Sequence, residues 1–315
     1  MSISVLGAGA FGTALAISLA QDGKRIVLWA RDPGDMQNTR ENTRRLPGYE
    51  LPASLTVTGD LAQACDAPIL LLATPMQSLS EFIRAHADIL SGKILVACCK
   101  GVDLKTGLGP AEIIRANCPS ATPAILSGPS FAVDIAAGLP TALTLACENG
   151  EILQSALSTH NIRLYRSADL AGVEIGGALK NVVAIACGIA IGAGLGESAR
   201  AALMTRGFAE MQRYAIAHGA RPETLAGLSG FGDLALTCAS EKSRNFAYGL
   251  ALGRGTALPT GTTVEGKATA KAVSIHAQSI GLDMPIADMV VAVLDNLITI
   301  REAIDMLLAR PLKEE

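Results

Sequence analysis

The stretch ISVLGAGAFGTALAISLAQDGKRIVLWARD, residues 3–32, decides the fold of the first half of the chain. Its first residues, Ile3–Leu6, are apolar and predict a short buried strand. Apolar residues on one side of Phe11–Gln21 predict a helix that ends at Gly23, and Ile26–Ala30 predicts a second apolar strand. A strand, a helix and a second strand within about 30 residues form a βαβ unit.

Three glycines, Gly7, Gly9 and Gly12, connect the first strand to the helix with the spacing G-x-G-x-x-G. In this context the first glycine permits a tight turn, the second lets backbone N–H groups approach a pyrophosphate, and the third lets the helix pack close to the strand. The N-terminus of the helix then faces the phosphates. The pattern therefore predicts a dinucleotide-binding site.

The end of the second strand bears on the choice of dinucleotide, because NAD-specific sites usually carry an acid there for the ribose hydroxyls. In this chain Arg31 comes first and Asp32 follows. An arginine can bind a 2′-phosphate, so the sequence favours NADPH over NADH. Asp32 either serves the ribose or is simply solvated.

The alternation of strands and helices continues to Arg166. Further strands are expected over Pro68–Pro75, Lys93–Gly101, Pro123–Ser130, Thr141–Cys147 and Ile162–Arg166, and helices over Ser78–Leu90, Gly109–Ala116 and Phe131–Ala137. Continuous apolar strands separated by helices indicate a mostly parallel sheet that is covered on both faces.

Ligands of such sheets bind beyond the carboxyl ends of the strands. Thr74-Pro75, Lys100-Gly101 and Ser127–Ser130 each close one predicted strand. Lys100 would therefore put an ammonium group where cofactor and substrate meet. Taken alone, Lys100 is better explained as an ordinary solvated lysine, and Ser127–Ser130 could be only a turn with a helix cap.

From about Asp169 onward only helices are expected. They cover Ala171–Ala193, Ala199–Ala217, Ser243–Leu252, Val264–Ser279, Pro285–Asn296 and Thr299–Ala309. The predicted fold class is α/β, with an N-terminal Rossmann-type, mostly parallel sheet and a C-terminal all-helical domain over the mouth of the sheet. We predict a dinucleotide-binding domain at residues 1–170 and a helical substrate domain at residues 171–315.

The segment EIGGALKNVVAIACGIAIGAGLG, residues 174–196, contains a single cation, Lys180. A helix that is apolar on all sides is expected to be buried. Lysines are almost never fully buried without a partner, so Lys180 either extends to solvent from between two domains or serves a function.

Two polar segments follow in the helical half. LSGFGDLALTCASEKSRNF places Asp233 in a glycine-rich turn, with Thr237 after it. Ser240 is predicted to cap the next helix, whose first turn would hold Arg244 and Asn245; free N–H groups and an arginine there suit a phosphate. TTVEGKAT adds Glu265 before another helix, where a capped loop is an equal alternative.

The composition narrows the function classes. Of the 315 residues 50% are hydrophobic and 17% charged, and the net charge is −3 without a run of Lys and Arg, so no nucleic-acid partner is expected. Seven cysteines without a C-x-x-C pair indicate reduced, buried thiols in a cytoplasmic protein, and four scattered histidines predict no metal site.

No membrane segment is expected either. The uncharged Ser2–Gln21 lacks the basic residues that precede the apolar core of a signal peptide. The uncharged Asn181–Gly196 is shorter than the roughly 20 residues that cross a bilayer.

Together these segments resemble the NAD(P)-dependent glycerol-3-phosphate dehydrogenases over nearly the whole chain. The resemblance is carried by Gly7–Leu15, Cys99–Gly101, Ser127–Ala132, Gly177–Val182, Gly196–Leu203, Thr205–Gly207, Gly232–Leu234, Ser243–Asn245 and Val264–Gly266. Ala10, Ser198 and Thr263 stand where the family often has Ser, Asn and Val.

The resemblance implies reversible reduction of dihydroxyacetone phosphate to sn-glycerol 3-phosphate for phospholipid synthesis, in a homodimer. It implies that Lys180 is the general acid and base, with Lys100, Asp233 and Thr237 near the reacting groups. The implied substrate-binding residues are Lys100, Gly128, Ser130, Lys180, Asp233, Ser243, Arg244 and Asn245. The expected cofactor-binding residues are Gly7, Gly9, Ala10, Phe11, Gly12, Arg31, Lys100, Ala132, Arg244 and Glu265.

Two other functions are compatible with the sheet. A two-domain hydroxy-acid dehydrogenase would need a carboxylate site and has no evident use for Ser243–Asn245. A non-catalytic NAD(P)-sensing protein would not need Lys100, Lys180 and Asp233 together.

Overall fold

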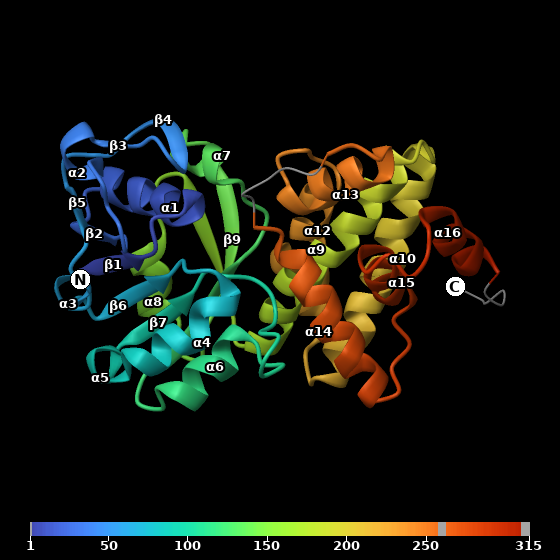
Figure 1. Ribbon diagram of the computed structural model, residues 1–315. Coiled ribbons are helices and arrows are strands. Elements are labelled where there is room, and N and C mark those ends of the chain that lie inside the picture. The colour runs from blue at the N-terminus through green and yellow to red at the C-terminus, as the bar shows by residue number, and fades with distance from the viewer. Residues whose placement is uncertain (1, 258–262, 310–315) are drawn as a thin grey trace.

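The computed structural model describes residues 2–257 and 263–309. Figure 1 shows two parts side by side, a sheet flanked by helices from the first half of the chain and a group of helices from the second half. The predicted α/β class with a helical C-terminal part is therefore confirmed.

The first part is built on an eight-stranded sheet with the strand order β10-β9-β8-β7-β6-β1-β2-β5. Its strands are β1 (Ile3–Leu6), β2 (Ile26–Trp29), β5 (Leu55–Thr58), β6 (Ile69–Leu72), β7 (Ile94–Ala97), β8 (Thr122–Ser127), β9 (Thr141–Ala146) and β10 (Ile162–Ser167). Neighbouring strands are parallel except β8 and β9. The predicted mostly parallel sheet is thus confirmed.

Helices cover both faces of this sheet. They are α1 (Ala10–Gln21), α2 (Met36–Thr39), α3 (Leu61–Ala64), α4 (Met76–Ala85), α5 (Ala87–Leu90), α6 (Pro110–Asn117), α7 (Ala132–Ala136) and α8 (Glu151–Leu157). Successive strand residues point to opposite faces, so Val96 packs with α1, α7 and α8, whereas Leu95 packs with α3, α4 and α6. Burial on both faces explains why these strands are continuously apolar.

Some elements of the first part differ from the prediction. The single helix expected over Ser78–Leu90 is two helices, α4 and α5, separated at His86. Strand β5 and the hairpin of β3 (Glu41–Asn42) with β4 (Leu46–Glu50) were not predicted, nor were the short helices α2, α3 and α8. The hairpin and β5 are partly exposed, so they lack the continuous apolar run that marks the inner strands.

The second part consists of helices. They are α9 (Leu170–Gly192), α10 (Gly196–Ala217), α11 (Pro222–Ala226), α12 (Asp233–Cys238), α13 (Arg244–Arg254), α14 (Glu265–Ser279), α15 (Pro285–Leu294) and α16 (Ile300–Leu308), with a π-helical turn η1 (Leu228–Gly232) before α12. All six predicted helices are present, whereas α11, η1 and α12 were not predicted.

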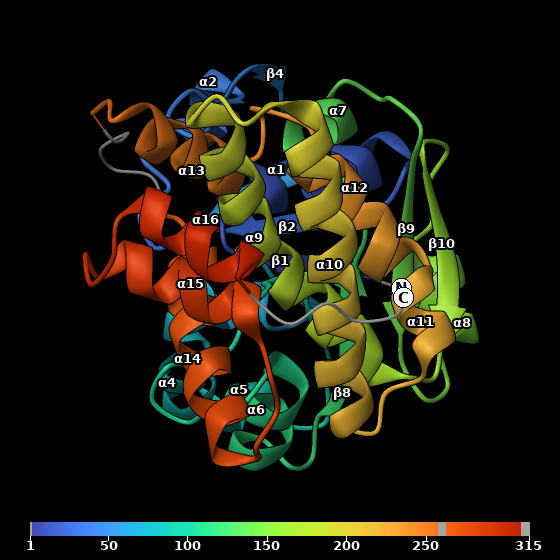
Figure 2. The same ribbon diagram turned by 90° about the vertical axis from the view of Figure 1, so that its right-hand side faces the viewer.

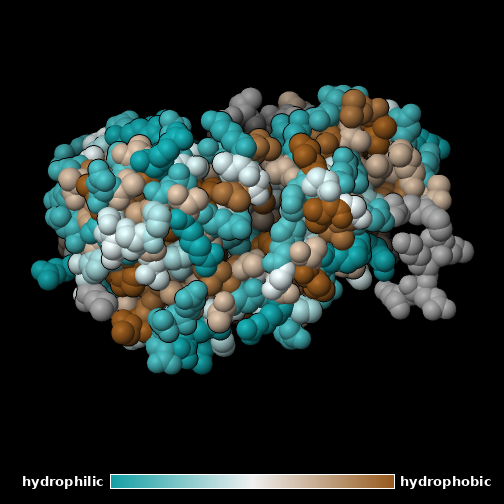
Figure 3. Space-filling model, turned by 90° about the horizontal axis from the view of Figure 1, so that it is seen from below, coloured by the Kyte–Doolittle hydropathy of each residue, from teal (hydrophilic) through white to brown (hydrophobic). Residues whose placement is uncertain are grey.

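Helix α9 is the centre of this part and packs against α10, α12, α13, α14 and α15 (Figure 2). It is long and apolar enough to cross a membrane, but 83% of its most apolar window is buried inside the protein, as in the core helix of a soluble domain. The face of the molecule in Figure 3 is mainly hydrophilic, with hydrophobic residues in separate groups. The apolar sequence around Lys180 therefore forms a core.

Glycines bring α9 and α13 into backbone contact. A Cβ at Gly188 of α9 would overlap the carbonyl oxygen of Phe246, and a Cβ at Gly249 of α13 would overlap that of Ile185. Gly192 and Gly253 face the partner helix equally closely. This contact sets the position of α13, whose first turn carries Arg244, relative to the helix that carries Lys180.

We predict that Gly249→Ala destabilises the protein. Alanine normally stabilises a helix over glycine by about 1 kcal/mol, but here its methyl group must push α13 away from α9, at a cost of roughly 1–3 kcal/mol. Denaturant unfolding should show the loss. Gly232→Ala is the matched control, because Gly232 has helical dihedral angles and its nearest neighbours would lie 3.7 Å from the new Cβ. Equal stability of the two variants would contradict the close-contact explanation.

Candidate active site

The candidate site lies where the order of the strands reverses. The chain runs from β1 outward through β2 to β5 and then returns to β6 on the other side of β1. In open sheets the crevice beyond the carboxyl ends of such neighbouring strands is where ligands bind. The ends of β6, β7 and β8 carry Thr74, Lys100 and Ser127–Ser130, as the sequence predicted, and α9 and α12 face them from the helical part.

The glycine-rich turn has the geometry expected of each glycine. Gly7 has a φ of +122°, and a Cβ there would lie 2.6 Å from the carbonyl oxygen of Ala73. A Cβ at Gly12 would overlap the carbonyl oxygen of Gly7. A Cβ at Gly9, the N-cap of α1, would point into open space. The open side at Gly9 and the free N–H groups of the first turn, with Ala10 and Phe11, fit a dinucleotide pyrophosphate.

A buried asparagine that sequence reasoning missed holds this turn in place. The Nδ2 group of Asn42 donates to the carbonyl oxygen of Ala8 at 3.0 Å and to Oγ1 of Thr13 at 2.8 Å. Asn42 belongs to β3, so the hairpin is fixed to the glycine-rich turn. Because one of its partners is a backbone carbonyl and the hairpin has no strand pattern, no sequence signal identified Asn42.

The end of β2 is basic. Arg31 is exposed, and Asp32 lies 3.9 Å from the guanidinium of Arg44 and accepts a hydrogen bond from the N–H of Gly34. Arg44, in the turn of the hairpin, is a second cation that the sequence analysis did not single out. Asp32, which follows Arg31 in the chain, is therefore close to a second arginine.

The centre of the site is a buried cluster around Asp233. Lys180 of α9 donates from Nζ to Oδ1 of Asp233 at 2.7 Å and to Oγ1 of Thr237 at 2.7 Å. The side chains of Lys180 and Asp233 are 9% and 1% exposed. Lys180 therefore does not extend to solvent but has the carboxylate partner that a buried ammonium requires.

Lys100 reaches the same carboxylate from the sheet. Its Nζ lies 2.5 Å from Oδ2 of Asp233 and donates to the carbonyl oxygen of Gly128 at 3.3 Å. Gly128 has a φ of +146°, and its carbonyl oxygen also accepts from Oγ of Ser130 at 3.2 Å. Six of the predicted residues thus meet at one point between the two parts of the protein: Lys100 after β7, Gly128 and Ser130 after β8, Lys180 of α9, and Asp233 and Thr237 of α12.

Burial dominates the electrostatics of Lys180. It lowers the pKa of Lys180 to about 8, against the raising influence of Asp233, and the positive charge of Lys100 adds to the lowering. Burial likewise raises the pKa of Glu265, against the lowering influence of Arg244, Lys100 and Lys180. Lys180 can therefore exchange a proton near neutral pH.

The glycine-rich sequence predicted that Asp233 lies in a turn, and this prediction is wrong. Asp233 is the first residue of α12 and follows the π-helical turn η1 without a break. Gly176 of α9 allows η1 to pack closely on that helix, since a Cβ at Gly176 would lie 2.8 Å from the carbonyl oxygen of Ser229. Gly230 is explained by close packing on α11, since a Cβ there would overlap the carbonyl oxygen of Leu225.

The first turn of α13 carries the candidate phosphate site. The cap of this helix is Ser243, whose Oγ accepts from the N–H of Phe246 at 3.2 Å, and not Ser240 as predicted; Ser240 instead closes a tight turn with Lys242. The helix cap lies three residues later than predicted, but Arg244 and Asn245 still belong to the first turn of the helix.

The side chains of this turn are arranged as donors. Within residues 2–257 and 263–309, the exposed guanidinium of Arg244 forms no hydrogen bond or ion pair. Asn245 accepts from the N–H of Gly266 at 2.9 Å through Oδ1, which leaves Nδ2 as a donor. Half-buried Glu265 precedes Gly266 as the first residue of α14, and Ala132 begins α7.

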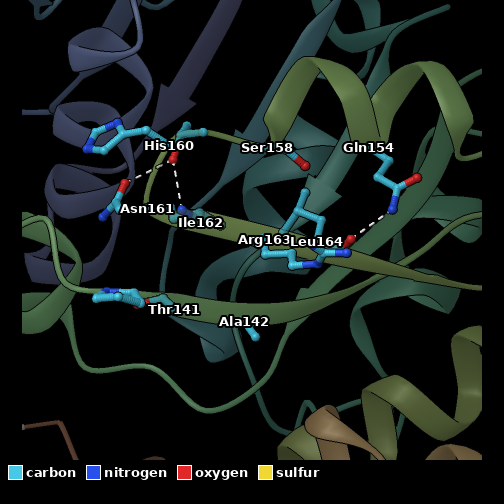
Figure 4. A pocket seen from close by; sticks show the side chains of 11 residues that line it. Thr141, Ala142, Gln154, Ser158, His160, Asn161, Ile162, Arg163 and Leu164 are labelled. Atoms are coloured by element: carbon cyan, nitrogen blue, oxygen red, sulfur yellow. Dashed lines mark hydrogen bonds between the residues drawn. The ribbon is translucent and has the colours of Figure 1, made fainter.

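A groove of about 640 Å³ lies elsewhere, at the edge of the sheet between β10, β9 and α8 (Figure 4). None of the predicted site residues lines it. Gln154 donates to the edge carbonyl of Leu164 at 2.7 Å and so covers part of the strand edge. Among the residues that the structure describes there is no cluster of histidine, cysteine or carboxylate side chains that could hold a metal, and all seven cysteines are free and buried.

Comparison with known proteins gives the same family for both parts of the chain. Residues 2–153 match the model of the NAD-dependent glycerol-3-phosphate dehydrogenase N-terminus, and residues 169–305 match that of the C-terminus. Glycerol-3-phosphate dehydrogenase [NAD(P)+] from Ruegeria sp. (strain TM1040) is 62% identical over the full length of both chains. The enzyme of the same name from Cereibacter sphaeroides is 58% identical over 99% of this chain and 100% of its own.

A solved structure agrees. The crystal structure of glycerol-3-phosphate dehydrogenase from Coxiella burnetii superimposes with a TM-score of 0.93 at 36% identity, covering 98% of this chain and 99% of its own. With both halves matched by family models and with relatives of this identity over the full length, the chain belongs to the NAD-dependent glycerol-3-phosphate dehydrogenase family.

Proposed function

We propose that this protein reduces dihydroxyacetone phosphate to sn-glycerol 3-phosphate with NAD(P)H, and that Lys180 is its proton donor. The observation that carries the proposal is the buried contact of Lys180, Asp233 and Lys100 between the two parts of a chain of this family. The product would serve phospholipid synthesis.

Bound NAD(P)H supplies the hydride. As negative charge develops on the carbonyl oxygen of the substrate, a cation already oriented toward it lowers the barrier. An ammonium group has three N–H donors, and Lys180 uses two of them on Asp233 and Thr237. The third donor is therefore oriented by the other two and is free to give its proton to the developing alkoxide.

Lys100 and Asp233 have supporting roles in this proposal. Asp233 offsets part of the cost of burying Lys180, and the charge of Lys100 keeps the site from being fully neutralised by Asp233. Lys100 would also contact a hydroxyl group of the substrate. Arg244, Asn245 and Ser243 would bind the phosphate group, with Gly128 and Ser130 on the sheet side. A phosphate held about one substrate length away orients the carbonyl for reaction.

The cofactor would bind along the glycine-rich turn, with Gly7, Gly9, Ala10, Phe11 and Gly12 at the pyrophosphate. The remaining candidate cofactor contacts are Arg31, Lys100, Ala132, Arg244 and Glu265. Arg31 at the end of β2, and Arg44 of the hairpin turn, which lies 3.9 Å from Asp32, support a preference for NADPH.

We further propose that residues 1–170 act as the dinucleotide-binding domain and residues 171–315 as the substrate domain. The protein is expected to act as a cytoplasmic homodimer without a membrane or nucleic-acid partner. A hydroxy-acid dehydrogenase or an NAD(P) sensor is less well supported, because neither uses the donor-rich turn Ser243–Asn245 beside Lys180.

Lys180→Ala should reduce kcat for dihydroxyacetone phosphate by about 10³-fold or more, because both the proton and the charge are lost. The wild-type rate of reduction should fall as pH rises through about 8, where Lys180 loses its proton. NADPH oxidation at 340 nm measures both effects. NADPH binding should persist in the variant, and Lys271→Ala, an exposed lysine of α14, is the control. Near-normal turnover of Lys180→Ala would end the assignment.

Arg244→Ala should raise KM for dihydroxyacetone phosphate about tenfold or more, since a charged hydrogen bond to the phosphate is lost. Unphosphorylated dihydroxyacetone should be affected much less. Steady-state kinetics with the two substrates measures the difference. Arg254→Ala, at the other end of α13, should leave both KM values unchanged; an unaltered KM in Arg244→Ala would count against the phosphate site.

Arg31→Ala should weaken NADPH more than NADH, by about tenfold in the ratio of kcat/KM values, because only NADPH carries the 2′-phosphate. Arg25→Ala is the matched control, because Arg25 lies at the opposite, amino end of β2. This variant should leave the ratio of kcat/KM for NADPH to kcat/KM for NADH unchanged. Equal effects of Arg31→Ala on both cofactors would show that the end of β2 does not select NADPH.

A further inference from the structure

Gln77, in the first turn of α4, makes two hydrogen bonds to the segment that follows Lys100. Its Nε2 donates to the carbonyl oxygen of Val102 at 2.8 Å, and its Oε1 accepts from the N–H of Leu104 at 3.0 Å. The side-chain amide thus pairs with backbone groups on both sides of Asp103, as a residue of a neighbouring strand would. A loop is in this way fixed to the beginning of a helix.

The segment that Gln77 holds is itself stiff. Asp103 is 2% exposed, and its Oδ2 accepts from the N–H and the Oγ1 of Thr106 at 3.0 and 2.8 Å. The N–H of Asp103 donates to the carbonyl oxygen of Leu108 at 3.0 Å. Because the turn is closed on itself, the two bonds from Gln77 place it as a unit against α4.

This unit begins immediately after Lys100. Gly101 has a φ of +123°, and a Cβ there would lie 3.0 Å from Oγ1 of Thr269 on α14 and 3.5 Å from Cγ of Met76 on α4. Val102 packs at the border of the hydrophobic core of the helical part. The backbone of Lys100 is therefore positioned by α4 on one side and by the helical part on the other.

We propose that Gln77 is a positioning residue that holds Lys100 against Asp233 for the reduction. The inference deepens the proposed function and rests on it for the kinetic part of its test. Gln77 stands three residues after Thr74, at the end of the strand next to β1, so it connects the cofactor edge of the sheet to the lysine that faces the substrate.

The kinetic test is a double-mutant cycle. Gln77→Ala should lower kcat/KM for dihydroxyacetone phosphate about tenfold, and should cause no further loss in a Lys100→Ala background, because residues that act through one another are not additive. Gln77→Glu keeps the acceptor for Leu104 but loses the donor to Val102, so its loss should be intermediate. Gln63→Ala, an exposed glutamine of α3 in the same domain, is the matched control and should match the wild type.

A second measurement does not depend on turnover. An amine-acylating reagent followed by mass spectrometry gives the rate at which Lys100 is modified, and this rate should rise several-fold in Gln77→Ala but not in Gln63→Ala. A wild-type protein without reductase activity would refute the proposed function alone, since the acylation rate still reports on Lys100. An unchanged acylation rate of Lys100 in Gln77→Ala, or losses that multiply in the cycle, would overturn the role of Gln77.

Discussion

The carboxylate of Asp233 lies between two ammonium groups that come from different parts of the molecule. Lys100 follows a strand of the sheet and Lys180 lies in the core helix of the second part, at 2.5 and 2.7 Å from the two carboxylate oxygens. Removing one member of such a buried group would leave an uncompensated charge, at a cost of about 3–5 kcal/mol. The contact of Asp233 with the two lysines therefore fixes the relative position of the two parts. It does so at the place where we propose that the substrate is reduced.

A second constraint on the geometry of the candidate active site comes from the glycines between α9 and α13. Gly188 and Gly249 let α9 and α13 touch along their backbones, and this contact sets the position of the helix that carries Arg244 relative to the helix that carries Lys180. In a protein where the proton donor and the phosphate contact belong to different helices, a loosened core would separate them. Stability and substrate geometry thus depend on the same residues, which gives a physical reason for glycine inside a long buried helix.

Most of the framework could be predicted from the sequence because it follows from periodicity and from glycine spacing. Ile3–Leu6, the G-x-G-x-x-G turn and the six long helices were placed within a few residues. The hairpin with Asn42 and the loop held by Gln77 could not be found, because their amides bind backbone groups, which carry no residue signature. Asp233 was singled out, but its helix was missed because Gly230 and Gly232 look like turn residues when the contact of Gly230 with Leu225 of α11 is unknown.

The local charge around Asp233 differs in sign from the net charge of the whole chain. The protein carries a net charge of −3, which would repel an anionic substrate. Yet Lys100, Lys180 and Arg244 all act on the half-buried Glu265, and the two lysines share the carboxylate of Asp233. Burial raises the pKa of Glu265, and these three cations lower it in part. At physiological ionic strength charges farther away than about 8 Å are largely screened, so the short-range excess of cations decides what binds. An acidic protein can therefore hold a phosphorylated substrate, because Lys100, Lys180 and Arg244 form a local excess of positive charge.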